Sequence, residues 1–380
     1  MRIALLTNGI YPYVMGGMQK HSYFLAKYLA QKEVYVDLYH YRDEALANNE
    51  DPFSSEELKF LNIIEVEYPR AKKFPGHYLY EQYLYSYKVY KAVINRELPD
   101  FIYAKGFSGW ALIKNKQNLQ REIPVGVNFH GYEMFQQWPD FKTGIKLQML
   151  KLPVKYNVSK ADYVFSYGGK VSDIIGKIGS NSKIIEIPTG IGASWLASDI
   201  SQRKPKGKRK FIFVGRAERR KGIVEINKFL SSTQDQNFEF HFVGPIKEAE
   251  KIKKPNVVYH GAIREQVELQ KILDQMDVLV CPSYSEGMPN VIMEAMARGL
   301  AIIATDVGAV NQMVDAGNGW LIAGKDITSG ITRAVSAALQ LSETQILDKK
   351  KRSTEKVREH FTWEKVIDKT IKEIKICINI

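Results

Sequence analysis

The chain has 380 residues, of which 45% are hydrophobic, with a formal net charge of +12 and two cysteines. Its length exceeds the roughly 250–300 residues at which a single hydrophobic core stops growing, so we expect two domains. The hydrophobic content excludes a disordered or fibrous protein, and two cysteines exclude a disulfide framework or a cysteine-based metal cluster.

The N-terminus turns polar by Asn8, too soon for a signal sequence. No apolar run reaches the roughly 18 residues of a membrane span. We therefore expect a cytoplasmic protein that is not integral to a membrane.

The excess of positive charge is spread over both halves of the chain. Diffuse basicity is weak evidence for nucleic acid, and it fits anionic substrates or anionic membrane lipid as well. We expect an anionic substrate, keep peripheral contact with an anionic membrane as a second expectation, and expect no nucleic acid. A basic nucleic-acid-binding protein stays an alternative because of the pI of about 9.3 and the basic run 203–210.

Short runs rich in β-forming residues alternate with helical patterns along the whole chain. This alternation predicts the α/β class, with two Rossmann-like, doubly wound domains built on parallel sheets. In the first half we expect strands at residues 2–7, 34–41, 62–68, 101–104, 124–129, 163–167 and 183–187. In the second half we expect them at 210–214, 238–243, 257–259, 278–281, 301–304 and 319–322.

The first expected strand leads into a loop that contains Gly16 and Gly17, and a helical pattern then runs to Leu29. Paired glycines before a helix allow a phosphate or a sugar to approach the backbone closely. The pattern is not the dinucleotide-binding G-x-G-x-x-G, so a bare turn remains the alternative.

A tyrosine-rich helical segment covers residues 77–91, with Tyr80, Tyr83, Tyr87 and Tyr90 on one stripe. We favour ordinary core packing of an amphipathic helix. Tyrosines beside lysines also suit a membrane interface, and docking there is the second hypothesis.

His130 follows the expected strand 124–129, at the edge of the sheet. A single histidine at a strand end is more often structural than catalytic, so the residue alone predicts little.

The boundary between the domains is expected in the polar run 201–210, which contains proline and glycine and cannot contribute to a core. A C-terminal helical pattern carries Trp363, Val366, Ile367, Ile371 and Ile374 on one stripe.

After the strand 210–214, the segment 215–222 places Arg216 at the carboxyl end of a strand and Lys221 at the start of the next helix. Ligands of open α/β sheets bind at that edge, and fixed cations there stabilise a departing diphosphate. We expect Arg216 and Lys221 to be functional, whereas Arg219 and Arg220 fit a solvated turn, so Arg219→Ala should be nearly silent.

Glu286 and Glu294 lie eight positions apart across a loop-to-helix junction that follows the strand 278–281. Pro289 is expected at the first helical position, where its missing N–H is no loss. The free N–H groups and dipole of the helix start suit phosphate, and the two carboxylates suit hydroxyl groups of a sugar and a ribose. The alternative is that Glu286 caps the helix and Glu294 is solvated.

These residues, with Gly287, Pro289, Asn290 and the run 294–299, resemble the E-x7-E signature of retaining glycosyltransferases of the GT-B fold, family 4 (glycosyl transferases group 1). The resemblance covers nearly the whole chain. It implies two domains facing a cleft: an acceptor domain at 1–195 with a returning helix at about 362–380, and a nucleotide-sugar domain at 208–361.

The resemblance also implies roles for individual residues. The first glutamate would contact the donor sugar, the second the ribose, and Arg216 and Lys221 the phosphates without a metal. His130 would contact the donor sugar, and the backbone around 261–264 the base. The implied catalytic residues are His130, Arg216, Lys221 and Glu286, and the implied donor site consists of Gly16, Gly17, Gly215, Arg216, Lys221, Gly261, Ile263, Glu286, Gly287, Met288, Pro289, Asn290 and Glu294.

The expected function is retaining transfer of a hexosyl or N-acetylhexosaminyl group from a nucleotide sugar, with UDP favoured, to a glycan or lipid-linked acceptor in surface polysaccharide synthesis. No cofactor or metal is expected. The alternatives are a GDP-mannose-dependent mannosyltransferase, and an epimerase or inverting transferase on the same fold.

Overall fold

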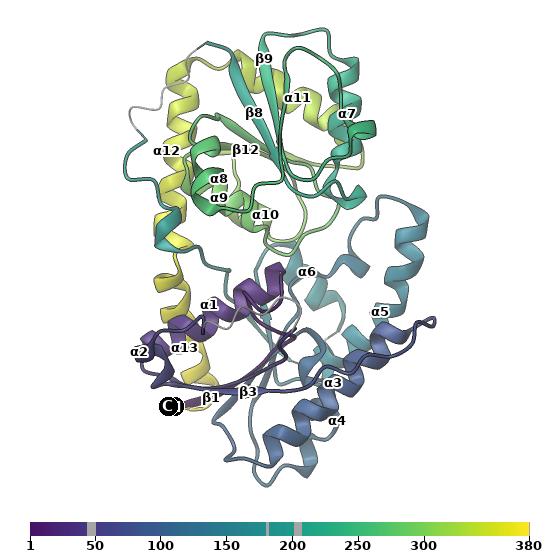
Figure 1. Ribbon diagram of the computed structural model, residues 1–380, viewed down its shortest axis with the longest axis vertical. Coiled ribbons are helices and arrows are strands. Elements are labelled where there is room, and N and C mark those ends of the chain that lie inside the picture. The colour runs from purple at the N-terminus through teal and green to yellow at the C-terminus, as the bar shows by residue number, and fades with distance from the viewer. Residues whose placement is uncertain (44–50, 180–181, 201–206, 380) are drawn as a thin grey trace. The chain divides into compact units, whose positions relative to one another are not determined.

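The computed structural model describes residues 1–43, 51–179, 182–200 and 207–379 (Figure 1). The chain divides into two compact units. The first contains Met1–His130, Ile145–Gly190 and Trp363–Ile380, and the second contains Gly131–Gly144 and Ile191–Thr362. The expected boundaries differ from this division chiefly at residues 131–144, which group with the second unit. Most of the expected linker, residues 201–206, lies outside the described residues.

The first unit is built on a parallel sheet with the strand order β3-β2-β1-β4-β5-β6-β7. Its strands are β1 (Arg2–Leu6), β2 (Tyr35–His40), β3 (Leu61–Glu65), β4 (Phe101–Lys105), β5 (Val125–Asn128), β6 (Tyr163–Ser166) and β7 (Lys183–Glu186). Its helices are α1 (Gly17–Gln31), α2 (Ser55–Leu58), α3 (His77–Ile94), α4 (Trp110–Lys114), α5 (Phe141–Lys160), α6 (Lys170–Lys177) and α13 (Trp363–Cys377). The order reverses between β1 and β4, as in Rossmann-type sheets.

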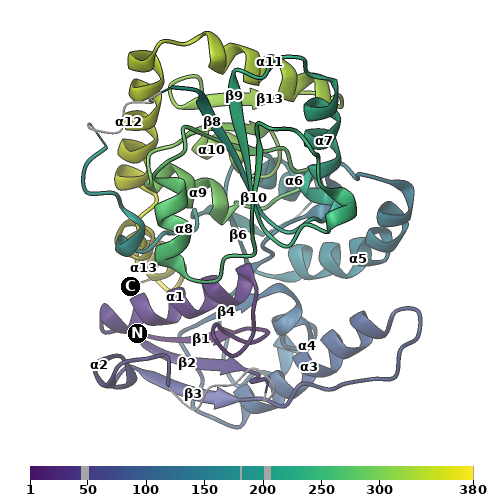
Figure 2. The ribbon, with the colours of Figure 1, turned by 45° about the horizontal axis from the view of Figure 1, so that its top comes forward.

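The second unit repeats this topology with the order β10-β9-β8-β11-β12-β13. Its strands are β8 (Arg209–Val214), β9 (Phe238–Val243), β10 (Val257–Gly261), β11 (Val278–Cys281), β12 (Ala301–Thr305) and β13 (Gly319–Ile322). Its helices are α7 (Ile223–Ser232), α8 (Gln266–Leu273), α9 (Asn290–Ala297), α10 (Val310–Met313), α11 (Ile327–Gln340) and α12 (Glu343–His360). Figure 2 shows β8, β9 and β10 side by side, with α7 and α11 adjacent to each other.

The predicted fold class and every predicted strand are confirmed, with strand ends shifted by at most three residues. Edge strands such as β3 and β10 are partly exposed, but most inner strands could be predicted because they are buried on both faces and are almost continuous apolar runs. In β4 and β11, for example, every residue is buried.

Trp363 anchors the C-terminal helix to the first unit. Its side chain is 1% exposed, and its ring stacks on Tyr28 and meets His21 edge-on. The predicted apolar stripe of this helix is confirmed, because its members belong to the core of the first unit. α13 therefore packs against α1, although the two lie at opposite ends of the sequence.

The tyrosine-rich segment forms the helix α3, but the predicted packing stripe is wrong. Of the four tyrosines only Tyr90 is buried, whereas Tyr80 and Tyr87 are 50% and 43% exposed. The helix buries a different face from the predicted one. The buried residues are Gln82, Tyr85, Ser86, Val89, Tyr90 and Val93. Tyr85, which is fully buried on this face, donates its hydroxyl to the carbonyl oxygen of Thr7, just after β1, at 2.8 Å.

Within the described residues, no helix combines the length and the apolar character needed to cross a membrane.

We predict that Trp363→Ala lowers the free energy of unfolding of the first unit by about 3–5 kcal/mol, because it leaves a cavity between α1 and α13. Thermal and urea denaturation of the whole chain measure this. Ile376→Ala in the same helix is the control, since Ile376 is 50% exposed and should change stability by about 0.5 kcal/mol or less. Equal effects of the two substitutions would contradict the anchoring role.

Candidate functional site

The candidate site lies at the carboxyl edge of the second sheet. The strand order reverses between β8 and β11, so the loops after these two strands lead to different faces of the sheet. In open α/β sheets this is where ligands bind. Arg216 and Lys221 follow β8 and Glu286 follows β11, so the topology brings the residues predicted from two distant segments to one place.

Lys221 and Glu286 form the centre of this edge. Lys221 Nζ donates to Glu286 Oε1 at 2.5 Å, and Arg220 Nη1 lies 4.0 Å from the same oxygen. Glu286 is 8% exposed, and the side chain of Lys221 is 20% exposed. An ammonium group has three N–H donors, so Lys221 can hold Glu286 with one and offer others to a ligand.

Arg216 is the exposed cation of the group. Its side chain is 72% exposed, and its Nε lies 3.0 Å from Glu218 Oε1. The second oxygen of Glu218 accepts from Arg220 Nε, also at 3.0 Å. An exposed ion pair contributes about 0–1 kcal/mol, so Arg216 can exchange Glu218 for a phosphate at small cost.

The helix α9 begins one residue later than predicted. Pro289 has an extended ψ of 117° and is the N-cap rather than the first helical residue, which is Asn290. No side chain caps this helix start, so its first N–H groups and the positive end of its dipole suit an anion. Glu294 lies just over one turn further on, as the spacing predicted, and it is partly buried.

Backbone contacts fix the loop that carries Glu286. Gly308 has a φ of +55°, and a Cβ there would lie 2.2 Å from the carbonyl oxygen of Glu286. The next residue, Ala309, donates its N–H to the carbonyl oxygen of Gly287 at 2.7 Å. Gln136 Nε2 donates to the carbonyl oxygen of Glu286 at 2.7 Å. The carboxylate is therefore held from its main chain, which leaves its oxygens for Lys221 and a ligand.

Sequence reasoning missed both Gly308 and Gln136. Gly308 lies shortly after β12, and a glycine behind a buried strand is a signal that could have been used. No local pattern marks Gln136, because it lies 150 positions from Glu286.

The prediction for Arg219 is wrong. Its Nη1 pairs with Glu225 Oε2 at 2.8 Å, and its guanidinium stacks 5.0 Å from the ring centre of Tyr284. Tyr284 donates its hydroxyl to the other oxygen of Glu225, which is buried. Arg219 thus links α7 to the loop after β11, and Arg219→Ala should loosen that loop instead of being silent. Arg220, the other residue expected to be solvated, binds Glu218 as described above.

The remaining part of the edge is made of strand ends that carry glycine. Gly215 donates its N–H to the carbonyl oxygen of Val243, and Gly244 donates to that of Gly261, at 2.9 and 2.8 Å. A Cβ on Gly244 would lie 1.9 Å from the carbonyl oxygen of Gly215, so no other residue fits. Gly261 is exposed and Ile263 partly buried in the loop before α8. Gly244 was missed, although it follows β9 as Gly215 follows β8.

The predicted residues of the first unit lie at the carboxyl edge of its own sheet. Gly16 and Gly17 are exposed at the start of α1, and nothing lies within 4 Å of a Cβ on Gly17. Gly16 has an extended φ of 167°, which any residue can adopt. A Cβ on Gly16 would lie 2.2 Å from Gln19 Oε1, so only Gly17 provides open space over the helix start, and no strained turn requires either glycine.

His130 belongs to a hydrogen-bonded cluster at this edge. Its Nδ1 lies 2.7 Å from the hydroxyl of Tyr167. Lys105, fully buried at the end of β4, donates to Asn128 Oδ1 at 2.6 Å and lies 3.2 Å from His21 Nδ1. Burial lowers the pKa of Lys105. Burial and then Lys105 lower the pKa of both His21 and His130 well below the usual value, so both imidazoles are neutral at pH 7.

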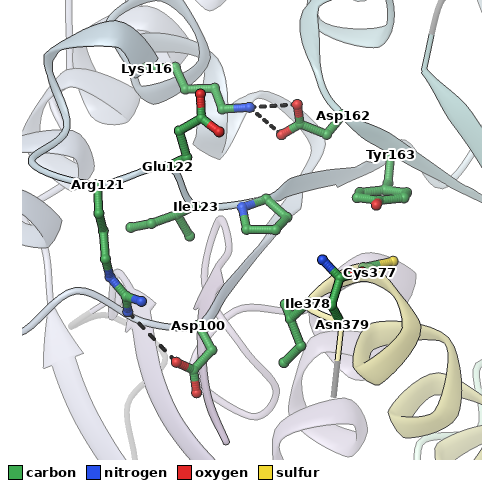
Figure 3. A pocket seen from close by; sticks show the side chains of 11 residues that line it. Asp100, Lys116, Arg121, Glu122, Ile123, Asp162, Tyr163, Cys377, Ile378 and Asn379 are labelled. Atoms are coloured by element: carbon green, nitrogen blue, oxygen red, sulfur yellow. Dashed lines mark hydrogen bonds and ion pairs between the residues drawn. The ribbon is translucent and has the colours of Figure 1, made fainter.

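A pocket of about 550 Å³ lies at the opposite, amino edge of the first sheet (Figure 3). Figure 3 shows its cations paired with its acids: Lys116 with Asp162, and Arg121 with Asp100 at 3.7 Å. None of the predicted site residues lines it. Both cations of its lining are already paired with acids, so we do not assign it to the candidate site.

We predict that Gly308→Ala displaces the Glu286 loop. Alanine at a positive φ costs about 1–2 kcal/mol, and here the new methyl group also meets the backbone of Glu286. Gly324→Ala is the matched control, since Gly324 has a φ of +86° but nothing within 4 Å of its Cβ position. The melting temperature should fall further for Gly308→Ala, and equal shifts would contradict the close contact.

We predict that stability falls as the pH drops below about 6.5 because His21 is buried in its neutral form. The unfolded chain binds a proton there and the folded chain does not, so His21 contributes at most about 1.4 kcal/mol per pH unit. Urea denaturation between about pH 8 and pH 5.5 measures the slope. The slope should be smaller in His21→Gln, and an unchanged slope would refute this assignment.

Comparisons with known proteins agree with the fold. The family description "Glycosyltransferase Family 4" matches residues 15–195, and "Glycosyl transferases group 1" matches residues 208–340. A Bacillus subtilis protein, TuaC, whose name assigns it to teichuronic acid biosynthesis as a glycosyltransferase, is 30% identical over 237 residues. That alignment covers 59% of this chain and only 58% of TuaC.

Two solved structures share the fold. The sucrose-phosphate synthase of Thermosynechococcus elongatus matches with a TM-score of 0.80 and 19% identity, covering 100% of this chain and 99% of that one. The Anabaena protein HepE, solved in complex with UDP-glucose, matches with a TM-score of 0.67 and 13% identity, covering 99% and 100%. With both halves matched by family descriptions and both sheets in the expected topology, the chain belongs to the group 1 glycosyltransferases of the GT-B fold, family 4.

Proposed function

We propose that this glycosyltransferase moves a hexosyl or N-acetylhexosaminyl group from a nucleotide sugar to a hydroxyl of a glycan or lipid-linked acceptor, with retention of the anomeric configuration. The observation that carries the proposal is the contact of Lys221 with Glu286 at 2.5 Å. It places the ammonium group of Lys221, which suits phosphate, beside the carboxylate of Glu286, which suits sugar hydroxyls. In a nucleotide sugar, the diphosphate and the sugar are joined by a single bridging oxygen, so their binding groups must be adjacent.

The phosphate side consists of Arg216, Lys221 and the start of α9. Negative charge grows on the diphosphate as the glycosidic bond breaks, so fixed cations and N–H groups stabilise the transition state more than the bound substrate. Arg216 offers a planar pair of donors, and Lys221 offers a point charge. We propose that these groups act without a metal.

The sugar side consists of two carboxylates. We assign Glu286 to hydroxyl groups of the donor sugar and Glu294 to the ribose, with Gly287, Met288, Pro289 and Asn290 lining the path between them. We assign the exposed backbone near Gly261 and Ile263 to the base, with Gly215 beneath it. For the first unit by itself, we assign Gly16 and Gly17 to donor binding and His130 to a catalytic contact with the sugar.

Retention needs no enzyme nucleophile in this proposal. The leaving phosphate helps to deprotonate the acceptor hydroxyl, which attacks from the same face. Cys281 ends β11, and burial and then Glu286 raise the pKa of its thiol to about 11. The thiol is therefore protonated at neutral pH and a poor nucleophile. His130, neutral in its cluster, would act as a hydrogen-bonding partner.

UDP is the favoured nucleotide, and surface polysaccharide synthesis in the cytoplasm is the favoured process. HepE is known with UDP-glucose, and TuaC carries the name of a polysaccharide pathway; both motivate the choice for this chain. GDP-mannose remains the alternative donor. An epimerase would form product without an acceptor, and an inverting transferase would give the opposite anomer, so an anomeric analysis of the product separates both from the proposal.

Nucleic-acid binding is not supported by the described part of the basic run. Arg209 donates to the carbonyl oxygen of Leu341 at 2.8 Å, and Lys210 lies 3.6 Å from Glu239. Residues 201–206 of the run lie outside the described residues. Glu286 and Glu294 would repel a phosphate backbone at the sheet edge.

We predict that a UDP-sugar raises the melting temperature of the chain, because a ligand that binds only the folded state stabilises it. A panel of UDP-, GDP-, ADP- and TDP-sugars in a thermal-shift assay tests this. Loss of a charge-assisted hydrogen bond in Glu294→Gln should weaken donor binding about tenfold or more. Glu355→Gln is the control, since Glu355 is exposed on α12.

Two outcomes would overturn the proposal. One is a wild-type chain that no activated sugar stabilises. The other is a Glu294→Gln variant that binds the donor as well as Glu355→Gln does. A response to GDP-mannose alone would replace the UDP assignment and keep the site.

A further inference from the structure

The helix α5 exposes an apolar stripe. Ile145, Met149 and Leu152 are 54%, 51% and 78% exposed, and their spacing of four and three residues puts them on one face. A surface helix normally buries such a face against the core. Here the core is met by other residues of the same helix, Val154 and Val158, which are fully buried.

The helix α5 is firmly attached to the first unit, although it exposes this apolar face. The carbonyl oxygen of Val158 accepts a hydrogen bond from the hydroxyl of Ser182 at 2.7 Å. Asn157, also fully buried, donates to the carbonyl oxygen of Pro153 at 2.9 Å. The Ser182 bond and the burial of Val154, Asn157 and Val158 fix the last two turns in the first unit, and the preceding turns present their apolar side chains outward.

The charge of α5 has one sign. Its 20 residues include Lys142, Lys146, Lys151, Lys155 and Lys160 and no acidic residue. Lys146 and Lys155 are exposed, and among the described residues neither forms an ion pair. Long lysine side chains beside an apolar stripe can keep their ammonium groups at the level of lipid headgroups while the stripe enters the acyl boundary.

The start of α3 extends this surface. Gly76 lies against Met149, whose terminal methyl carbon is 3.6 Å from the position of a Cβ on Gly76. Beside it, Phe74 and Tyr80 are 45% and 50% exposed, and their ring centres are 5.9 Å apart. We name the set Ile145, Met149, Leu152, Phe74 and Tyr80 the α5–α3 surface. Aromatic residues of this kind are enriched where proteins meet the membrane interface.

We propose that the α5–α3 surface docks the enzyme on an anionic phospholipid bilayer. Charge complementarity selects this occupant, because a helix with five lysines and no acid faces a negative surface favourably. A second copy of the chain would place the same positive charge opposite itself. A typical protein partner fits poorly as well, since lysine is depleted at protein interfaces. The surface is independent of the residues assigned to the nucleotide sugar.

Vesicle cosedimentation of the full chain tests this proposal. The probes are phosphatidylcholine vesicles with and without phosphatidylglycerol, free of any saccharide lipid, at about 0.1 M and 0.5 M salt. The apolar variant is Ile145→Gln, Met149→Gln and Leu152→Gln, with Val267→Gln and Ile376→Gln as its control; those two residues are 61% and 50% exposed. The charge variant is Lys146→Gln and Lys155→Gln, with the exposed Lys271→Gln and Lys325→Gln as its control.

We expect the wild type and both controls to bind phosphatidylglycerol vesicles, and high salt to weaken that binding. The apolar and the charge variant should each bind at least about tenfold more weakly. All replaced side chains are exposed, so unchanged melting temperatures would show that folding is intact.

Three results would overturn the proposal. The first is a wild type that stays in the supernatant with anionic vesicles, and the second is an apolar variant that binds like its control. The third is a dimer, measured by light scattering, that the apolar variant dissociates, which would assign the surface to a second copy.

Discussion

The ion pair of Lys221 with Glu286 is the interaction on which the candidate site depends, and backbone packing rather than charge keeps it in place. Glu286 is 8% exposed, so its charge is costly unless a partner compensates it. Lys221 is that partner at 2.5 Å, and the loop behind the pair is fixed by Gly308 and Gln136. A rigid loop matters because hydrogen-bonding groups of the protein stabilise a transition state best when they are already in place.

The cations at the carboxyl edges of the two sheets have different surroundings. In the second unit each cation of the edge has an acid close by: Lys221 has Glu286, Arg216 has Glu218, and Arg219 has Glu225. In the first unit, Lys105 lies among His21, Asn128 and His130, and burial lowers its pKa instead. Cations held beside acids suit a diphosphate, whereas the neutral imidazoles of His21 and His130 suit hydroxyl groups.

The sequence predicted what depends on local pattern. Strands buried on both faces are apolar runs, and the helix after β11 could be predicted from its residue types. Glu286 and Glu294 could be identified there because the segment resembles the E-x7-E signature. Contacts between distant segments could not be predicted. Nothing near Gln136 marks its bond to Glu286, and the bond of Tyr85 on α3 to the carbonyl oxygen of Thr7 also joins segments far apart in the sequence.

Arg219 shows why a cluster of like residues is hard to sort from sequence. Arg219, Arg220 and Lys221 form one turn of a 3-10 helix, in which successive side chains point about 120° apart. The three cations therefore face Glu225, Glu218 and Glu286 respectively. The role of each cation depends on the direction of its side chain. That direction depends on the residue at which the turn begins. The sequence shows only adjacent positive charges, so the structural cation and the site cation look alike until the turn is placed.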